Sequence, residues 1–595
     1  MTTIDYRNAA LTAEQRTEDL LKDMTLREKA GLMFQPATVL PEPGGLTPED
    51  AWNKAKEDII TRHISHLHVV NGTHAEEIAE WTNRLQQLAQ ETRLGIPITF
   101  STDPRNGFGG TPFTGQALTG LSKWPDATGI AASGDPQTAK AFGDTIRQEF
   151  LAMGIRLYLG PMADLFTEPR WSRGWGTFGE DVEIASTMVA AFIEGLRGSA
   201  TLGPESLAAV VKHFPGAGPQ QGGHDAHDAR FPEQVYPGNQ QELHLRPFEA
   251  AFAAGVTQVM PYYGMPVKTE WDERGFAFNV PVIDGLLRKR YHFDGIVVSD
   301  WNVIDAAIVD GHRFGPNAYG VESLTPMERI HLALAAGIDQ FGGDRLPELV
   351  VQLVQSGQVT EDRINTSVRR LLLEKFRLGL FDNRFVDIQR AAAISASPAL
   401  QENSREAQRA SLTLIKNETS DGSAVLPLIP GTRVYAEGFS WTGEAIALEL
   451  VASPDDADIC LIHLQTPWSP DPDNVLGDLF HSGSLEFDQP TIDHLAELAA
   501  KAPVVASVYL ERPAVLSAVL PHCSAVIGEF GVSPKVLIDV LTGASPFTGT
   551  LPFDLPSSYA AVTVSREDVP FDTASPLFTH GHGLTLDAVS GASSR

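Results

Sequence analysis

Charged and aromatic side chains follow short apolar runs at five places in the first two thirds of the chain, in segments 96–107, 156–165, 207–216, 256–264 and 295–302. Each run has the length and composition of a β-strand, and segments of helical length separate the runs. This alternation predicts a parallel sheet closed into a barrel, in which the residues that do chemistry stand at the carboxyl ends of the strands. The residues at these positions are Asp103, Lys212, His213, Tyr262, Tyr263, Asp300 and Trp301.

Two of these strand ends carry a carboxylate. Asp300 ends the run GIVVSD and precedes Trp301, an arrangement suited to covalent attack on the anomeric carbon of a sugar whose ring stacks on the indole. Asp103, in STDPRNG, can accept hydrogen bonds from two sugar hydroxyls. Each also has a structural interpretation, because an aspartate after a strand often caps a helix or opens a turn.

Lys212 and His213 lie side by side at the end of the run AAVVKHF. They can donate hydrogen bonds to the hydroxyl groups of a ligand. A lysine in this position can also form a Schiff base with a carbonyl substrate, as in barrel aldolases. The structural alternative is a buried lysine that pairs with a carboxylate.

A glycine-rich loop, residues 213–232, contains His224, Asp225, His227 and Asp228. These side chains can be interpreted as metal ligands, as an Asp–His pair for proton transfer, or as part of a solvated loop. No remote ligands accompany them, so we predict no metal site.

Two further pairs of residues have both a functional and a structural interpretation. Arg170 and Arg173, in EPRWSRGWGTFGED, can bind hydroxyl groups or form ion pairs with acidic residues such as Glu180 of the same segment. His66 and His68 lie on one face of a strand, and we interpret them as structural.

The order of the predicted elements indicates an α/β protein of two domains. A (β/α)8 TIM-like barrel is expected in residues 1–388. It begins with a helical segment at 14–34, in which Thr25 and Glu28 have the spacing of a capping box. A first strand is predicted near His63, helices at 75–92, 346–357 and 361–377, and a last strand in 335–343. Residues 389–404 predict a linker, because the stretch 390–411 is first small and polar and then helical. Residues 405–595 repeat the alternation more compactly, which predicts a smaller α/β sandwich domain.

Composition and charge argue against some classes of binding partner. The 595 residues carry 45 Lys and Arg against 75 Asp and Glu, a formal net charge of -30, which argues against nucleic acid and anionic membranes. Cys460 and Cys523 indicate neither a disulfide framework nor a metal–cysteine site, and the first residues lack the pattern of a secretory signal. We therefore expect a cytoplasmic enzyme with a small-molecule substrate, and a homo-oligomer is compatible with these features.

Several of these segments together resemble glycoside hydrolase family 3. They include LLKDMTLREKAGLMF, TEPRWSRGWGTFGED, VVKHFPGAGPQQGGHDAH, VMPYYGMP, GIVVSDWN and GTLPFDLP, in the family's order along most of the chain. The resemblance implies a barrel and an α/β sandwich with the site between them. It also implies hydrolysis of β-linked glycosides with retention of configuration, commonly of glucosides and xylosides.

The resemblance also implies a role for each residue that matches a family motif. Asp300 corresponds to the nucleophile and Trp301 to part of the sugar platform. Tyr263 corresponds to a tyrosine near the nucleophile, with Tyr262 beside it. The residues that correspond to those holding the terminal sugar are Asp103, Arg173, Lys212 and His213.

The general acid/base is left open. Two-domain members supply a glutamate from a loop of the second domain. The carboxylates of that loop here, residues 465–487, are Asp471, Asp473, Asp478 and Glu486. Single-domain β-N-acetylhexosaminidases of the family use a histidine paired with an aspartate, and Asp225 and His227 have that spacing. The candidates are Glu486, Asp473 and His227; a second-domain carboxylate is favoured because the second domain and the SDW motif fit the two-domain branch.

These observations predict a retaining, exo-acting β-glucosidase that removes terminal β-linked sugars from oligosaccharides or glycosides through a covalent glycosyl-enzyme. This chemistry requires no metal or other cofactor. The nearest alternatives are a β-N-acetylhexosaminidase, a β-xylosidase or a phosphorolytic enzyme of the same family. Alternatives of other classes are a Schiff-base aldolase acting through Lys212 and a sugar-binding relative that lacks the acid.

Overall fold

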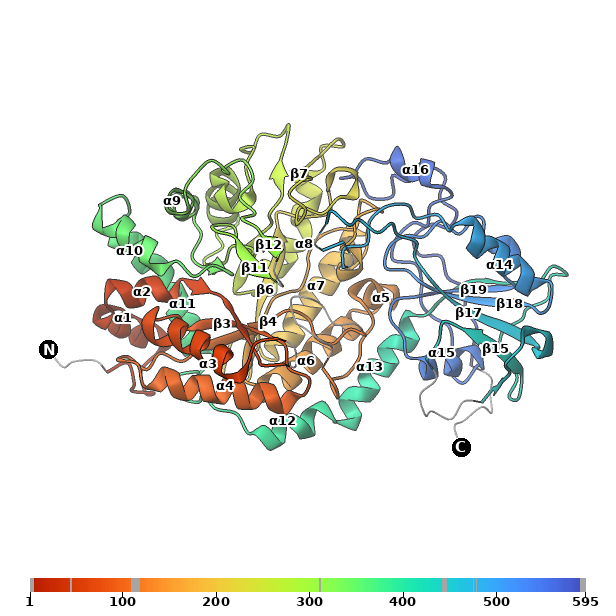
Figure 1. Ribbon diagram of the computed structural model, residues 1–595, viewed down its shortest axis with the longest axis horizontal. Helices are drawn as coiled ribbons and strands as arrows, with labels where there is room; N and C mark the ends of the chain where they lie inside the picture. Colours follow the sequence, from red (N-terminus) through yellow and green to blue (C-terminus); the bar gives the residue numbers. More distant parts are fainter. Residues whose placement is uncertain are drawn as a thin grey trace.

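The computed structural model consists of two α/β units that lie side by side (Figure 1). It describes residues 5–42, 45–108, 118–309, 312–440, 447–474, 476–477 and 479–588. The first unit holds the elements from α1 to α11, and the second holds those from β14 onward. This arrangement confirms the predicted α/β class with two successive units. Within the described ranges, no helix combines the length and the apolar composition needed to cross a lipid bilayer.

The main sheet of the first unit has seven strands, all paired in parallel. In spatial order they are β10 (Ile296–Val297), β8 (Gln258–Pro261), β6 (Ala208–Phe214), β5 (Ile155–Tyr158), β4 (Thr99–Thr102), β3 (His66–Val70) and β2 (Ala37–Val39). Five of these, β4, β5, β6, β8 and β10, lie in the five apolar runs, so those strand predictions are confirmed. Residues that follow these strands therefore meet at one edge of the sheet.

The two edges of this sheet are linked by further pairings. Val298, after β10, forms a parallel bridge with Gln340, and β13 (Phe341–Gly342) pairs in parallel with β1 (Phe34–Gln35). β1 leads along the chain directly into β2 at the opposite edge. This order of pairings favours the predicted barrel, with β1 and β2 together as its first strand.

The start of the first unit differs from the prediction. The segment expected to be helical contains α1 (Ala13–Asp23) and α2 (Leu26–Leu32), and β1 begins at Phe34, so the first strand is not the one near His63. The capping box of Thr25 and Glu28 is present as the sequence indicates. No Gly or Pro separates α2 from β1, which is why the apolar run AGLMF conceals the change from helix to strand.

Long helices pack around the sheet of the first unit (Figure 1). They are α4 (Ala75–Gln90), α6 (Pro136–Ala152), α7 (Val182–Arg197), α8 (Gln241–Ala253), α9 (Pro326–Ala336) and α11 (Glu361–Arg377), with the shorter α3 (Pro48–Lys56), α5 (Ala127–Ala132) and α10 (Pro347–Gln355). The predicted helices at 75–92, 346–357 and 361–377 are confirmed as α4, α10 and α11. α6 and α7 approach so closely that a Cβ at Gly143 would lie only 2.3 Å from the Phe192 carbonyl oxygen.

The second unit is built on a six-stranded sheet in which β14 runs antiparallel to β19 and the other described pairings are parallel. The strands in spatial order are β14 (Thr413–Asn417), β19 (Ala525–Glu529), β18 (Val504–Tyr509), β17 (Ile459–Gln465), β15 (Arg433–Glu437) and β16 (Glu449–Leu450). Its helices are α14 (Gln489–Ala499), α15 (Pro534–Leu541) and α16 (Tyr559–Thr563). The predicted linker holds α12 (Ile388–Ser395) and the start of α13 (Pro398–Ser411), so it is helical; the domain boundaries themselves stay a prediction.

The last segment of the second unit returns to the first. The buried carboxylate of Asp568 accepts hydrogen bonds from the backbone N–H groups of Gly238 (2.7 Å) and Gln240 (2.8 Å), just before α8. The Thr167 hydroxyl donates to the Glu567 carbonyl oxygen at 2.6 Å. These hydrogen bonds connect the two units next to the loops that follow β5 and β6.

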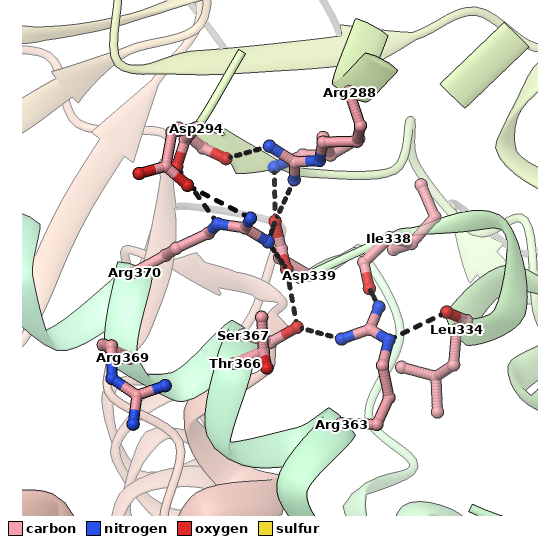
Figure 2. Close-up of polar contacts among 12 residues, drawn as sticks. Arg288, Asp294, Leu334, Ile338, Asp339, Arg363, Thr366, Ser367, Arg369 and Arg370 are labelled. Atoms are coloured by element: carbon pink, nitrogen blue, oxygen red, sulfur yellow. Dashed lines mark hydrogen bonds and ion pairs between the residues drawn. The ribbon is translucent and has the colours of Figure 1, made fainter. Parts of the chain in front are cut away.

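A buried carboxylate, Asp339, joins several elements at the start of β13 (Figure 2). It accepts hydrogen bonds from Arg288 (2.7 Å), Arg370 (3.1 Å) and the Ser367 hydroxyl (2.6 Å). The Val297 N–H of β10 donates to the same carboxylate at 3.0 Å. Asp339 therefore ties β10 to α11, and two guanidinium groups offset the cost of burying its charge.

We predict that Asp339→Asn destabilises the protein by about 3–5 kcal/mol, because it leaves two arginines without their buried counter-charge. Thermal unfolding followed by circular dichroism should show a lower midpoint. Asp294 is a matched control, since it also pairs with Arg370, at 3.3 Å, but its side chain is 95% exposed. Asp294→Asn should cost less than about 1 kcal/mol. Equal effects of the two substitutions would contradict this account.

Candidate active site

Asp300 lies shortly after β10 with its two carboxylate oxygens in different environments. Oδ1 accepts a hydrogen bond from the Trp301 N–H at 2.8 Å. Oδ2 is buried and has no hydrogen-bond partner among the described residues. Burial raises the pKa of the Asp300 carboxyl, and the positive charges of His227 and Arg173 offset part of that rise. One oxygen is thus held in place while the other is available to a bound molecule.

Arg173, His213 and Asp164 form a chain of hydrogen bonds beside Asp300. Arg173 Nη2 lies 3.0 Å from His213 Nε2, and His213 Nδ1 lies 2.8 Å from Asp164 Oδ2. Because a guanidinium only donates, His213 must accept at Nε2 and donate from Nδ1, which makes its imidazole neutral. Burial and the charges of Arg173 and Lys212 accordingly hold the pKa of His213 well below its usual value.

Arg173 has a second, unpartnered group in the same site. Its Nη1 is buried and makes no hydrogen bond within the described part of the chain. The negative charge of Asp300 is among the causes that raise the pKa of Arg173, so the two side chains are electrostatically coupled. A ligand that presents a hydroxyl or carbonyl oxygen to Nη1 would satisfy this donor.

Asp103, Lys212 and His68 form a second charged group. Lys212 Nζ lies 2.8 Å from Asp103 Oδ1, and His68 Nε2 lies 3.6 Å from Asp103 Oδ2. Burial alone would raise the pKa of Asp103, but the charges of Lys212 and His68 lower it below its usual value. Lys212 is therefore a buried lysine paired with a carboxylate that belongs to the same candidate site.

His68 belongs to the site, which corrects its interpretation as a structural residue. Its ring lies 5.2 Å from that of Trp301, edge to face, and it also contacts Asp103. Asp164 was not singled out from the sequence, although it lies near the end of one of the five apolar runs, RLYLGPMADL. The only signal for it was an acidic residue soon after a strand end, which is common in loops.

The adjacent tyrosines Tyr262 and Tyr263 donate hydrogen bonds to different groups of the site. The Tyr263 hydroxyl donates to the Trp301 carbonyl oxygen at 2.9 Å, and burial together with the charge of Asp300 raises its pKa. The Tyr262 hydroxyl donates to Asp225 Oδ2 at 2.9 Å. Tyr263 is thus the tyrosine beside Asp300.

Asp225 and His227 form a buried pair next to Asp300. His227 Nδ1 lies 2.6 Å from Asp225 Oδ1, and the Trp171 indole N–H donates to Asp225 Oδ2 at 2.8 Å. Burial would raise the pKa of Asp225, but His227 and Arg173 lower it strongly. Tyr263 contacts the His227 ring at 4.7 Å and donates its hydroxyl hydrogen to the carbonyl oxygen of Trp301, the residue after Asp300. An imidazole suited to proton transfer therefore packs against the same tyrosine that supports the segment of the candidate nucleophile.

The other polar residues of this loop make different contacts. The His224 ring stacks on Phe231 at 3.8 Å, and Asp228 binds Arg230 at 2.9 Å. Over the ranges that the structure describes, no three His, Cys, Asp or Glu side chains are arranged to hold a metal ion. Arg170 forms a structural ion pair at 2.7 Å, with Glu168 rather than Glu180.

The second-unit carboxylates of loop 465–487 are placed differently from His227. Glu486 is exposed, and its Oε1 accepts a hydrogen bond from the Tyr559 N–H at 2.9 Å. Asp473 is exposed, and Asp471 pairs with Arg230 at 2.6 Å. Among the described residues, no hydrogen bond or ion pair joins any of them to Asp300 or Arg173. Asp478 lies outside the described residues.

Comparison with known proteins gives matches along nearly the whole chain. The family model for the glycosyl hydrolase family 3 N-terminal domain matches residues 25–373. The chain is 42% identical over 586 residues to a probable beta-glucosidase C of Aspergillus flavus, covering 98% of this chain and 92% of that protein. It is 38% identical over 602 residues to a periplasmic beta-glucosidase/beta-xylosidase of Dickeya chrysanthemi, covering 97% and 91%.

Solved structures share the fold at lower identity. A β-glucosidase from Erythrobacter marinus has a TM-score of 0.80 and 22% identity, covering 98% of this chain and 84% of that one. An exo-1,3/1,4-beta-glucanase from a Pseudoalteromonas species has a TM-score of 0.76 and 21% identity, covering 100% and 77%. The matches in sequence, the two-unit fold and the strand-end site agree: the chain belongs to glycoside hydrolase family 3.

Proposed function

We propose that the chain is an exo-acting, retaining β-glucosidase in which Asp300 is the nucleophile and His227 the general acid/base. The observation that carries this proposal is the buried, unpartnered Oδ2 of Asp300, in a site where Tyr263 contacts the paired imidazole of His227 at 4.7 Å and bonds to the Trp301 carbonyl oxygen. The names of the relatives, beta-glucosidase C and beta-glucosidase/beta-xylosidase, support glucosides as the first class of substrate.

In the first step, Oδ2 of Asp300 bonds to the anomeric carbon of the terminal sugar. The bond from that carbon to the glycosidic oxygen breaks, and a proton from His227 goes to the leaving oxygen. The products are a glycosyl ester on Asp300 and a free alcohol or shortened oligosaccharide. In the second step, His227 takes a proton from water as the water oxygen attacks the anomeric carbon, which releases the sugar and restores the carboxylate.

The contacts of His227 support its role in proton transfer. Since Nδ1 is held by Asp225 at 2.6 Å, Nε2 is the nitrogen that would carry the transferred proton. Asp225 stays ionised, because its pKa is lowered, and it stabilises the imidazolium that exists before the first proton transfer. Glu486 and Asp473, by contrast, are exposed side chains that make no described contact with this charge network.

The hydroxyl groups of one terminal sugar would be held by the charged groups around Asp300. Asp103 offers acceptor oxygens, while Lys212 and Arg173 offer donors, Arg173 through its unpartnered Nη1. Trp301 provides an aromatic face for the ring. A set of groups that surrounds one sugar supports exo-action.

A β-xylosidase is the second candidate, because the Dickeya relative is named for both activities. Comparing 4-nitrophenyl β-glucoside with the β-xyloside and the β-N-acetylglucosaminide would rank these specificities. The same relative is named periplasmic, so the cytoplasmic location expected from the sequence stays a prediction.

The assignment of Asp300 can be tested by covalent labelling. Incubation with 2-deoxy-2-fluoro-β-glucosyl fluoride should add one sugar to the peptide that contains Asp300, because the fluorine slows release of the covalent intermediate. Asp300→Asn should lower kcat by about 10³-fold or more and abolish the labelling. Peptide mass spectrometry and steady-state kinetics provide the measurements. A label on a different peptide would refute the assignment.

The role of His227 predicts a dependence on the leaving group. His227→Ala should lower kcat/KM for methyl β-glucoside by about 10²–10⁴-fold, but much less for 2,4-dinitrophenyl β-glucoside, whose leaving group needs no proton. Azide should also accelerate the variant by attacking the glycosyl-enzyme without base assistance. Glu486→Gln is the matched control and should behave like the wild type; the reverse pattern would transfer the role to Glu486.

The charges around Asp300 predict a shift in the pH profile. The nucleophile must be ionised, and Lys212 is one of the cations that oppose the burial-driven rise in the pKa of Asp300. Lys212→Met removes that charge and leaves Asp103 uncompensated, so the pKa of Asp300 should rise further. The acid limb of kcat/KM against pH should therefore move to higher pH. Lys29→Met is the control: it breaks the ion pair with Glu361 and should not shift the acid limb of the kcat/KM profile. If Lys212→Met does not shift the acid limb either, that result contradicts the argument.

A further inference from the structure

An aromatic side chain of the second unit packs on the candidate acid/base of the first. Phe480, in loop 465–487 after β17, has its ring centroid 4.9 Å from that of His227. The guanidinium carbon of Arg173 lies 5.7 Å from the same ring. Phe480 is only 5% exposed, so its ring is enclosed by its surroundings. The second unit thus reaches the site through an apolar ring.

We infer that Phe480 is a positioning residue for proton transfer, and that through it the second unit holds the imidazole of His227 toward the glycosidic oxygen. This inference rests on the proposed role of His227. It assigns to the second unit a task other than supplying the acid itself.

The geometry around His227 gives the physical reason. The hydrogen bond to Asp225 fixes Nδ1, while the tilt of the imidazole about that bond also depends on the rings that pack against it. Tyr263 contacts the ring edge to face at 4.7 Å, and its hydroxyl is itself anchored on Trp301. Phe480 supplies a further aromatic contact, from the other unit. Without it, the direction of Nε2 is less restricted and water can approach the ring.

Arg512, three residues after the end of β18, holds the loop that carries Phe480. It is fully buried, and its Nη2 donates to the Pro467 carbonyl oxygen at 2.6 Å. Its Nη1 lies 3.3 Å from the Gly483 carbonyl oxygen and 3.4 Å from that of Arg170. One guanidinium therefore joins both ends of the loop segment and attaches it to the chain that bears Arg173.

The neighbour of Phe480 in sequence is also fixed. His481 Nδ1 lies 2.8 Å from Glu511, and its ring stacks on Trp468 at 4.2 Å. On the preceding side, the Phe480 N–H donates to the Leu476 carbonyl oxygen at 2.8 Å, so the backbone of Phe480 is anchored on both sides. This rigidity is needed if a ring on a loop is to orient a catalytic group on another unit.

The test measures leaving-group dependence in Phe480→Ala and Phe480→Leu. If Phe480 orients His227, Phe480→Ala should lower kcat/KM for methyl β-glucoside by about 10- to 100-fold, since small misplacements of a catalytic group have effects of this size. Hydrolysis of 2,4-dinitrophenyl β-glucoside should change by less than about threefold, because it needs no acid. Phe480→Leu, which keeps much of the volume, should recover part of the loss.

Phe487→Ala is the matched control, because Phe487 lies in the same loop and is only partly buried. It should leave the ratio of the two activities unchanged. Equal losses on both substrates in Phe480→Ala, with a wild-type ratio in Phe480→Leu, would overturn the inference while leaving the role of His227 intact. If the activity of His227→Ala does not depend on the leaving group, both the proposed acid/base and this inference are overturned. If the wild-type enzyme hydrolyses no glycoside, the proposed function itself is overturned.

Discussion

The buried carboxylate of Asp300 is the constraint on which the rest of the site depends. Removing this charge from water is unfavourable, and the surrounding positive charges make it tolerable. Each of those cations is itself held by another group: Arg173 by His213, Lys212 by Asp103, and His227 by Asp225. The proposed nucleophile is therefore one member of a balanced network, with Oδ2 of Asp300 and Nη1 of Arg173 as its open positions within the described part of the chain.

The two units contribute different kinds of side chain to the site. The polar groups around Asp300 come from residues within or after β3, β4, β5, β6 and β8 of the first unit, where a parallel sheet brings strand ends together. The described contacts of the second unit to this group are aromatic and structural, through Phe480 and Arg512. If Asp225 and His227 of the first unit transfer the proton, that step needs no carboxylate from the second unit. The contribution of loop 465–487 then depends more on its conformation than on its charged side chains.

Much of the fold followed from local sequence. Strand-length apolar runs, helical periodicity and capping boxes are short-range signals, and the strands β4, β5, β6, β8 and β10 and the helices α4, α10 and α11 lie where these signals indicate. The first strand was missed because β1 is two residues long and follows α2 with no Gly or Pro between them. The helical second part of the stretch around 390–411 lies in α13, whereas its small residues, expected to be irregular, form α12.

The sequence by itself determined which strand ends carry reactive side chains, because their order along the chain and their alternation with helices are properties of short segments. Asp300, Asp103, Lys212, His213 and Arg173 were named on that basis and on the motifs around them. Only the tertiary structure decided which carboxylates are paired, that Asp164 and His68 join the site, and that Phe480 contacts His227. Those contacts link residues up to hundreds of positions apart, and their energies depend on burial and direction, which no local pattern encodes.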